Sequence, residues 1–163
     1  MNEDQKQTLM KWRSRCKRAQ IAHSYTAISY GRYHLFLGIM LIALTTTSCV
    51  LIFAPNTIMP SWLSPTIGIS AALFAYLQTF LRLSEQADSQ RVVARRYGAL
   101  KKEIEYILDF QLNATNCMDQ VDSVRVKEYE IATDAPHALS HRWKKAANET
   151  KSENDFFSRR NRP

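Results

Sequence analysis

Charged side chains are missing from the middle of this sequence. No Asp, Glu, Lys or Arg lies between Arg32 and Arg82, although the chain of 163 residues carries 22 basic and 15 acidic residues. Cysteine is also scarce, with three residues, which excludes a disulfide-stabilised scaffold. Glycine and proline number 4 and 5, too few for a collagen-like or low-complexity chain. The glycines are also too widely separated to form a phosphate-binding loop of the kind that nucleotide enzymes use.

Two long apolar windows occupy the uncharged stretch, at residues 35–54 and 62–81. A helix rises about 1.5 Å per residue, so about 20 residues span about 30 Å, the thickness of the hydrocarbon core of a bilayer. Backbone groups in lipid must pair with one another, so each window is predicted to be a transmembrane helix. The alternative is a pair of apolar helices buried in the core of a soluble protein.

The segment between the windows contains Pro55 and Pro60 and no charged residue. A residue before proline disfavours helix, so the first span is expected to end just before Pro55. Ser64 followed by Pro65 is typical of a helix start, with serine as the cap and proline in the first helical position. The sequence therefore predicts an all-α fold in which residues 35–81 form a two-helix transmembrane hairpin.

Basic residues flank the two windows, whereas the turn between them has none. They are Lys6, Lys11, Arg13, Arg15, Lys17, Arg18 and Arg32 on one side, and Arg82, Arg91, Arg95, Arg96, Lys101 and Lys102 on the other. Lys and Arg concentrate on the cytoplasmic side of membrane proteins, so we expect a multi-pass protein of the cell inner membrane with both termini in the cytoplasm. Trp62 is then at the outer interface, and Tyr30 and Tyr33 are at the inner one, where aromatic rings are enriched.

The N-terminal region, residues 1–34, is predicted to be a cytosolic basic helix. It is mostly polar, unlike a cleavable secretion signal. Leu9, Trp12, Cys16 and Ala19 recur every three or four residues and form an apolar stripe between basic faces. Such a stripe packs against another helix or lies on anionic lipid. The three cysteines are expected to be free thiols, because they lie in the reducing cytosol or in the membrane.

Residues 82–112 are predicted to form an amphipathic cytosolic rod that continues the second span without a break. Apolar residues alternate at steps of four and three along it, as in a coiled-coil seam. These residues are Val93, Tyr97, Leu100, Ile104 and Ile107. The seam requires a partner, which is either the N-terminal helix of the same chain or a neighbouring subunit, in which case it is an oligomer seam.

The C-terminal part shows weaker patterns. Residues 113–147 are predicted to contain short cytosolic helices, one over 121–131 and one over 139–147, separated by Pro136. Residues 148–163 are polar and are expected to be disordered.

Polar and small residues inside the apolar windows are the candidate functional residues. They are Thr45, Thr46 and Ser48 in the first window, and Gly68, Ala72, Ala75, Gln78 and Thr79 in the second. One interpretation is packing within the hairpin, with each hydroxyl bonded to a carbonyl of its own helix. The other is that these groups line an aqueous path. Two helices cannot enclose a pore, so that path requires several copies of the chain.

No catalytic or metal-binding constellation stands out. His137 and His141 are four residues apart, but no cysteine or acidic pair accompanies them at a useful spacing. We therefore expect neither an enzyme nor a metal or cofactor site. The formal net charge of +7 suggests nucleic acid as a partner, but the positive charge lies beside the apolar windows, where membrane topology accounts for it. Membrane lipid is the expected partner, and nucleic acid is not.

Three segments together resemble a known family. They are the stretch from Trp12 to His23 (WRSRCKRAQIAH), the hairpin, and residues 73–108, with Ser84-Glu85-x-Ala87, Tyr97 and Lys102-Glu103-Ile104-Glu105. This arrangement, over residues 8–112, resembles the SLATT domains, two-transmembrane effectors associated with SMODS and SLOG modules in bacteria. The chain departs from the family in having Ser89-Gln90 where a histidine is often found.

The resemblance implies a bacterial effector of a nucleotide-signalled antiphage system. Such effectors are thought to oligomerise, to form a pore or disrupt the inner membrane, and to cause cell suicide. A nucleotide-sensing partner protein is implied as well. Arg91, Arg95 and Arg96 are candidate contacts for an anion or for lipid headgroups. The alternative is a non-conducting membrane anchor or scaffold that recruits a cytosolic partner through its helical rod. A phage-type holin is a third option.

Overall fold

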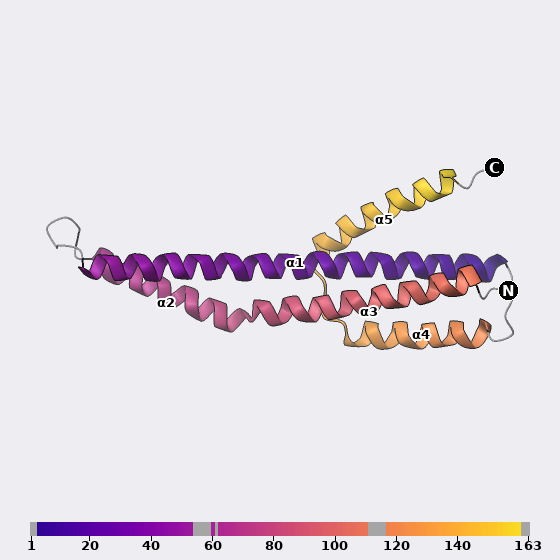
Figure 1. Ribbon diagram of the computed structural model, residues 1–163, viewed down its shortest axis with the longest axis horizontal. Coiled ribbons are helices and arrows are strands. Elements are labelled where there is room, and N and C mark those ends of the chain that lie inside the picture. Colours follow the sequence, from indigo (N-terminus) through magenta and orange to yellow (C-terminus); the bar gives the residue numbers. More distant parts are fainter. Residues whose placement is uncertain (1–2, 54–59, 61, 111–116, 161–163) are drawn as a thin grey trace. The chain divides into compact units, whose positions relative to one another are not determined.

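The computed structural model describes the chain except for residues 1–2, 54–59, 61, 111–116 and 161–163. The described part consists of five helices and no strand, which confirms the predicted all-α fold (Figure 1). The helices are α1 (Glu3–Phe53), α2 (Leu63–Leu81), α3 (Leu83–Phe110), α4 (Cys117–Asp134) and α5 (Ser140–Arg160). The chain divides into two compact units: residues 1–27 with 88–163, here called the bundle, and residues 28–87, here called the apolar unit.

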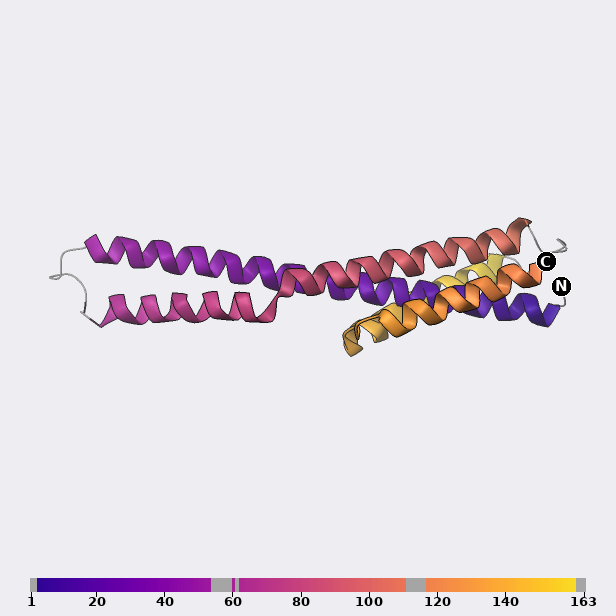
Figure 2. The same cartoon turned by 90° about the horizontal axis from the view of Figure 1, so that it is seen from below.

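The core of the bundle lies between the first part of α1, α3 and α4, which run side by side in Figure 1 and Figure 2. The core residues are Leu9, Cys16 and Ala19 of α1, Val93, Tyr97, Leu100, Ile104 and Ile107 of α3, and Cys117, Val124 and Ile131 of α4. Spacings of three, four or seven residues place each set on one face of its helix, and the three faces meet in the core. The α3 seam is therefore filled by α1 and α4 of the same chain. Its interpretation as an oligomer seam is corrected, because these side chains are buried within one copy.

In the apolar unit, α2 runs antiparallel to the second part of α1. A β-carbon placed on Gly38 would lie 3.9 Å from Nε2 of Gln78, and one placed on Gly68 would lie 4.0 Å from Oγ of Ser48. Gly38 of α1 therefore lies opposite Gln78 of α2, and Ser48 lies opposite Gly68, which is the order expected for antiparallel helices. The two glycines present no side chain at these contacts, which allows the helices to approach closely.

A break at Arg82 separates α2 from α3. Arg82 adopts a left-handed conformation, with φ 43° and ψ 41°, and α3 begins at the next residue. The side-chain Nε2 of Gln86 donates to the carbonyl of Leu81 at 3.1 Å, and the backbone N–H of Gln86 donates to the carbonyl of Arg82 at 3.1 Å. Gln86 thus donates hydrogen bonds to the carbonyls of Leu81 and Arg82, which have no partner within α2 because they lie at its C-terminal end. The expectation of one unbroken rod is corrected to two helices joined at a capped bend.

Other helix boundaries also differ from expectation. The N-terminal helix and the first span are one helix, α1, because no residue in it breaks helical structure. Trp62, and not Ser64, is the N-cap of α2, and it makes no side-chain capping bond. The expected turn at residues 55–61 lies outside the described residues, apart from Pro60, whose carbonyl accepts from the N–H of Leu63 at 3.1 Å.

The C-terminal part is more ordered than expected. The short helix predicted over 121–131 lies within α4, and residues 135–138 around Pro136 are not helical, as predicted. The helix expected over 139–147 begins one residue later, at Ser140 of α5. The expectation of disorder is corrected over residues 148–160, because α5 extends to Arg160, and residues 161–163 lie outside the described residues. Residues 140–160 contain neither proline nor glycine, and Ala146 and Thr150 are buried and anchor the first half of α5.

Candidate functional site

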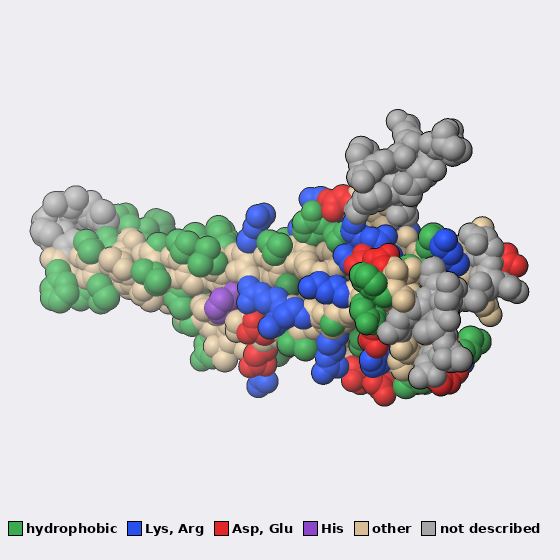
Figure 3. Space-filling model, turned by 45° about the vertical axis from the view of Figure 1, so that its right-hand side comes forward, with side chains coloured by type: hydrophobic (Ala, Val, Ile, Leu, Met, Phe, Trp, Pro, Cys, Tyr) green, Lys and Arg blue, Asp and Glu red, His purple; other side chains and the backbone are tan. Residues whose placement is uncertain are grey.

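The apolar unit exposes large hydrophobic side chains along both of its helices. Two stretches of the chain, Asp4–Phe53 and Leu63–Phe110, are long and apolar enough to cross a membrane. The most apolar window of the first stretch is 0% buried, and that of the second is 11% buried. The core helix of a soluble protein is, by contrast, mostly buried. Phe53 and Phe80 are 87% and 85% exposed. On the face drawn in Figure 3, the apolar unit shows mainly hydrophobic side chains, and most of the charged side chains lie on the bundle. A soluble monomer rarely presents a continuous apolar surface of this kind.

A band of hydroxyl groups interrupts this surface on α1. Thr45, Thr46 and Thr47 are exposed, and each donates its hydroxyl proton to a backbone carbonyl one turn earlier. The distances to the carbonyls of Leu41, Ile42 and Ala43 are 2.9, 2.8 and 2.8 Å. Each hydroxyl proton is therefore satisfied within its own helix, while the oxygen keeps a lone pair that faces outward.

The contact face of α2 differs in part from the predicted stripe. Gly68 and Gln78 lie against α1, and Ala71 is buried, whereas Ala72 and Thr79 are exposed. Ala75 is half-buried. Thr79 donates to the carbonyl of Ala75 at 3.0 Å, in the same way as the threonines of α1. Sequence reasoning missed Ala71, although its spacing of seven residues from Gln78 places both on one face.

The interior of the apolar unit contains two polar atoms whose hydrogen-bonding capacity is unused. Oε1 of Gln78 and Nδ1 of His34 are buried, and neither has a hydrogen-bond partner within the described residues. A buried polar atom without a partner costs about 1–3 kcal/mol, so such atoms are uncommon in a well-packed interior. His34 was not among the predicted site residues. Its position at the inner end of the first apolar window was the available signal.

The arginines predicted to contact an anion or headgroups are exposed and have partners in the chain. Arg91 pairs with Asp88 at 2.8 Å, and Arg96 pairs with Asp134 at 3.7 Å. Nε of Arg95 donates to the carbonyl of Arg91 at 3.4 Å. These side chains are exposed at the surface of the bundle, and each is engaged with another residue of the chain.

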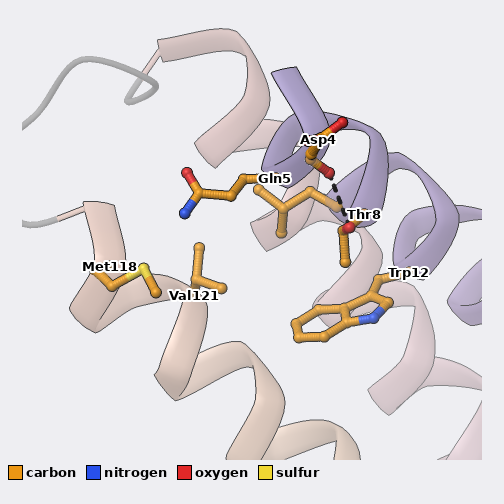
Figure 4. Close-up of a pocket in the computed structure, with 7 residues that line it drawn as sticks. Asp4, Gln5, Thr8, Trp12, Met118 and Val121 are labelled. Carbon is orange, nitrogen blue, oxygen red and sulfur yellow. Dashed lines mark hydrogen bonds between the residues drawn. The ribbon is translucent and has the colours of Figure 1, made fainter. Parts of the chain in front are cut away.

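Two hollows are found among the described residues of the bundle. An apolar pocket of about 200 Å³ lies between the start of α1 and the start of α4, and is lined by Leu9, Trp12, Met118 and Val121 (Figure 4). At its rim, Oγ1 of Thr8 donates to the carbonyl of Asp4, so the hydroxyl is already engaged. The lining of this pocket is mostly apolar, with Asp4, Gln5 and Thr8 as its polar residues.

The second hollow is a groove of about 510 Å³ between α3 and α4. Two ion pairs cross it, Lys127 with Glu103 at 2.6 Å and Arg96 with Asp134 at 3.7 Å. Among the described residues, no three His, Cys, Asp or Glu side chains gather as a metal site would require. His137 and His141 are both exposed.

Sequence reasoning also missed a buried polar cluster in the bundle. His23 stacks on Tyr97 of α3 and is hydrogen-bonded to Gln90. Burial lowers the pKa of His23, while the hydrogen bond with Gln90 raises it by a smaller amount. The signal was present in the spacing, since His23 continues the α1 stripe four residues after Ala19.

The thiol of Cys16 lies in the same core. Burial raises the pKa of Cys16 from 9.0 to about 12, and the charge of Glu128 adds to this effect. A raised thiol pKa lowers the fraction of reactive thiolate at neutral pH.

The distinguishing feature of the described residues is therefore an exposed apolar surface with a hydroxyl band. Chemistry at such a surface consists of contact with lipid or with other helices. A scan against protein-family models, a search of curated proteins and a search of solved structures each found no match to this chain.

Proposed function

We propose that the apolar unit crosses the inner membrane twice and that the bundle lies in the cytoplasm. The observation that carries this proposal is the exposure of large hydrophobic side chains along both helices of a unit with no charged residue between Arg32 and Arg82. Water is a poor solvent for such a surface, whereas lipid is a good one. The two apolar stretches of the unit, in α1 and α2, are helical where the structure describes them, as a membrane requires. Tyr30 and Tyr33 precede the first span, which supports an inner interface at this level.

The activity that we propose is that of a membrane effector whose copies assemble and breach the membrane. The resemblance to SLATT domains supports this role, with phage infection as the trigger, cell suicide or dormancy as the outcome, and a nucleotide or a nucleotide-sensing partner as the signal. The seam of α3 is occupied within one copy, so assembly would use the exposed faces of the apolar unit. Thr45 and Thr46 are the polar groups that such an assembly would bring together, because their outward lone pairs accept hydrogen bonds from water.

The alternative is a non-conducting anchor whose bundle recruits a cytosolic partner. One observation favours it: every hydroxyl of the Thr45–Thr47 band already donates to its own helix. Such a helix is stable against lipid without water or a neighbouring helix. In this case the threonines contribute nothing beyond local hydrogen bonds.

A vesicle assay separates the two functions. The full chain is reconstituted into liposomes that contain a self-quenching dye, and release is followed with and without cyclic nucleotides. Variant Thr45→Leu/Thr46→Leu/Thr47→Leu removes the band, and Thr66→Leu is the matched control, because Thr66 is an exposed threonine that donates to the carbonyl of Trp62.

An effector predicts dye release by the wild type, a loss of about tenfold or more in the triple variant, and little change in Thr66→Leu. An anchor predicts no release by any of the proteins, although each co-floats with the vesicles. Release by the triple variant at the wild-type rate would contradict the role given to the threonine band.

A further inference from the structure

His23 lies in a buried junction of the bundle that the proposed function does not use. The side chain is 4% exposed, and its Nδ1 lies 2.5 Å from Oε1 of Gln90. Nε2 of Gln90 donates to the backbone carbonyl of His137 at 3.2 Å. The amide oxygen of Gln90 is therefore the atom that faces the ring, so Nδ1 of His23 carries the proton and donates. An Nδ1–H is present in both the neutral ring and the imidazolium, so it is burial, and not this bond, that favours the neutral ring.

The junction attaches the segment of residues 136–151, here called the C-terminal strap, to α1 and α3. The edge of Trp143 meets the His23 ring, with centroids 6.3 Å apart and planes at 75°. Thr26 is fully buried, and its Oγ1 accepts from the N–H of Leu139 at 3.3 Å. His23 and Thr26 thus hold the start of the strap from one face of α1. Figure 1 shows α5 beginning beside this part of α1.

The strap itself contributes no residue to the core of the bundle, although His23 stacks on the core residue Tyr97. The core cluster is formed by residues of α1, α3 and α4, and it includes none of the strap. Further along the strap, Ala146 and Thr150 are buried. Tyr25 donates to Glu149 at 2.8 Å, and Nζ of Lys145 lies 4.4 Å from the centre of the Tyr25 ring. The strap can therefore detach while α1, α3 and α4 keep their shared core.

The surroundings of His23 favour the neutral ring over the charged one. The groups that face it are Gln90 and Tyr97 from α3 and Trp143 from α5, none of which carries a negative charge at neutral pH. The charged groups of α5 on this side, Lys145 and Glu149, contact Tyr25 instead. The aromatic rings attract an imidazolium weakly, which offsets part of the desolvation. Burial remains the larger effect and lowers the pKa of His23 below 6.5.

We propose that the C-terminal strap is a pH-sensitive catch, which is closed while His23 is neutral and is released when His23 takes up a second proton. This device does not depend on whether the apolar unit conducts. At pH values above 6.5, His23 is neutral whether the strap is attached or released, so attachment is strongest there. As pH falls below 6.5, the released form binds a proton that the closed form excludes. Attachment then weakens by up to about tenfold per pH unit, until the pKa of the buried ring is reached.

The test is hydrogen exchange of the full chain in detergent micelles at pH 7.5, 6.5 and 5.5, with each rate corrected for the intrinsic pH dependence of exchange. We expect protection of residues 136–151 to fall as pH falls, while peptides that contain Leu100 to Ile107 keep theirs. His23→Gln retains an N–H donor toward Gln90 and does not titrate, so its strap protection should be independent of pH. His137→Gln and His141→Gln are matched controls, because both histidines are exposed, and they should respond as the wild type does.

A wild-type strap whose protection is constant from pH 7.5 to 5.5 would overturn the proposal, as would a pH response that persists in His23→Gln. If His23→Gln disturbs the fold at pH 7.5, Gln90→Glu provides a test of opposite sign. A carboxylate beside His23 stabilises the imidazolium, so the strap of this variant should be more protected at pH 5.5 than at 7.5. An NMR titration of the His23 ring in the wild type must give a pKa below 6.5, and a value above 6.5 would refute the catch.

Discussion

Gly98 of α3 lies against the side chain of Gln20 of α1. A β-carbon on Gly98 would lie 2.9 Å from Nε2 and 3.2 Å from Cδ of Gln20, closer than side chains normally approach. The neighbour is the far end of a flexible side chain, so it can move. The two helices of the bundle therefore approach closely at a position where glycine is useful but not conformationally required, since the φ angle there is negative.

Gly98→Ala should change the free energy of unfolding by less than about 1 kcal/mol, because the gain in helix propensity of about 1 kcal/mol is offset by displacement of Gln20. In a Gln20→Ala background the displacement is absent, and the same change should stabilise the bundle by about 1 kcal/mol. Chemical unfolding in detergent, followed by circular dichroism, measures both. If Gly98→Ala changed the free energy of unfolding equally in the two backgrounds, displacement of the Gln20 side chain would have no energetic cost, which would contradict this prediction.

Ile104→Ala should destabilise the bundle by about 2–5 kcal/mol, since Ile104 is fully buried among α1, α3 and α4. Val92→Ala, at an exposed position of the same helix, is the control and should cost much less. Light scattering on the same samples should show an unchanged oligomeric state, because the seam is filled within one copy. A variant that dissociates an oligomer without loss of stability would restore the intermolecular interpretation of the seam.

Gln78→Leu should stabilise the contact between α1 and α2 by about 1–3 kcal/mol. The substitution removes a buried oxygen that has no partner among the described residues, and it keeps a side chain of similar size against Gly38. Thr79→Leu is the matched neighbour and should have little effect, since Thr79 is exposed and its hydroxyl is satisfied. Thermal denaturation in one detergent compares the three proteins. A destabilised Gln78→Leu would mean that the amide has a partner that the chain alone does not supply.

Cys16 should react with maleimide far more slowly than an ordinary thiol. Burial raises its pKa from 9.0 to about 12, so the thiolate fraction near neutral pH falls by about a thousandfold. The rate should increase as pH rises toward that pKa, because only the thiolate reacts. The variant Cys49→Ala/Cys117→Ala isolates this thiol for mass spectrometry. Rapid labelling under native conditions, at the rate seen in denaturant, would contradict the packing of α1 in the bundle.

The sequence predicted the helices well because apolar residues recur every three or four positions in α1 and α3. It did not identify the partner of the α3 seam, because spacing defines a face and not what covers it. The bend at Arg82 was missed because it depends on the side chain of Gln86, which caps the end of α2 from five residues away. The extension of α5 was missed because its sequence is mostly polar, and composition does not indicate that Ala146 and Thr150 are buried against the rest of the bundle.

The candidate site was only partly predictable for a similar reason. Ser48, Gly68 and Gln78 are at the contact between α1 and α2, as one interpretation of the polar residues required. Ala72 and Thr79 share a helical face with Gly68 but are exposed, because the contact is centred closer to Ala71. The rotation of a helix about its axis depends on packing, and a stripe of small residues constrains it only within about one residue position.

Membrane insertion of the apolar unit is tested most directly by carbonate extraction of membranes from cells that express the full chain. Alkaline carbonate releases proteins held by charge or by other proteins, and it leaves those that span the lipid. We predict that the protein stays in the membrane pellet after carbonate and after high salt, and that only detergent releases it. Recovery in the supernatant as a compact monomer, without detergent, would contradict the account.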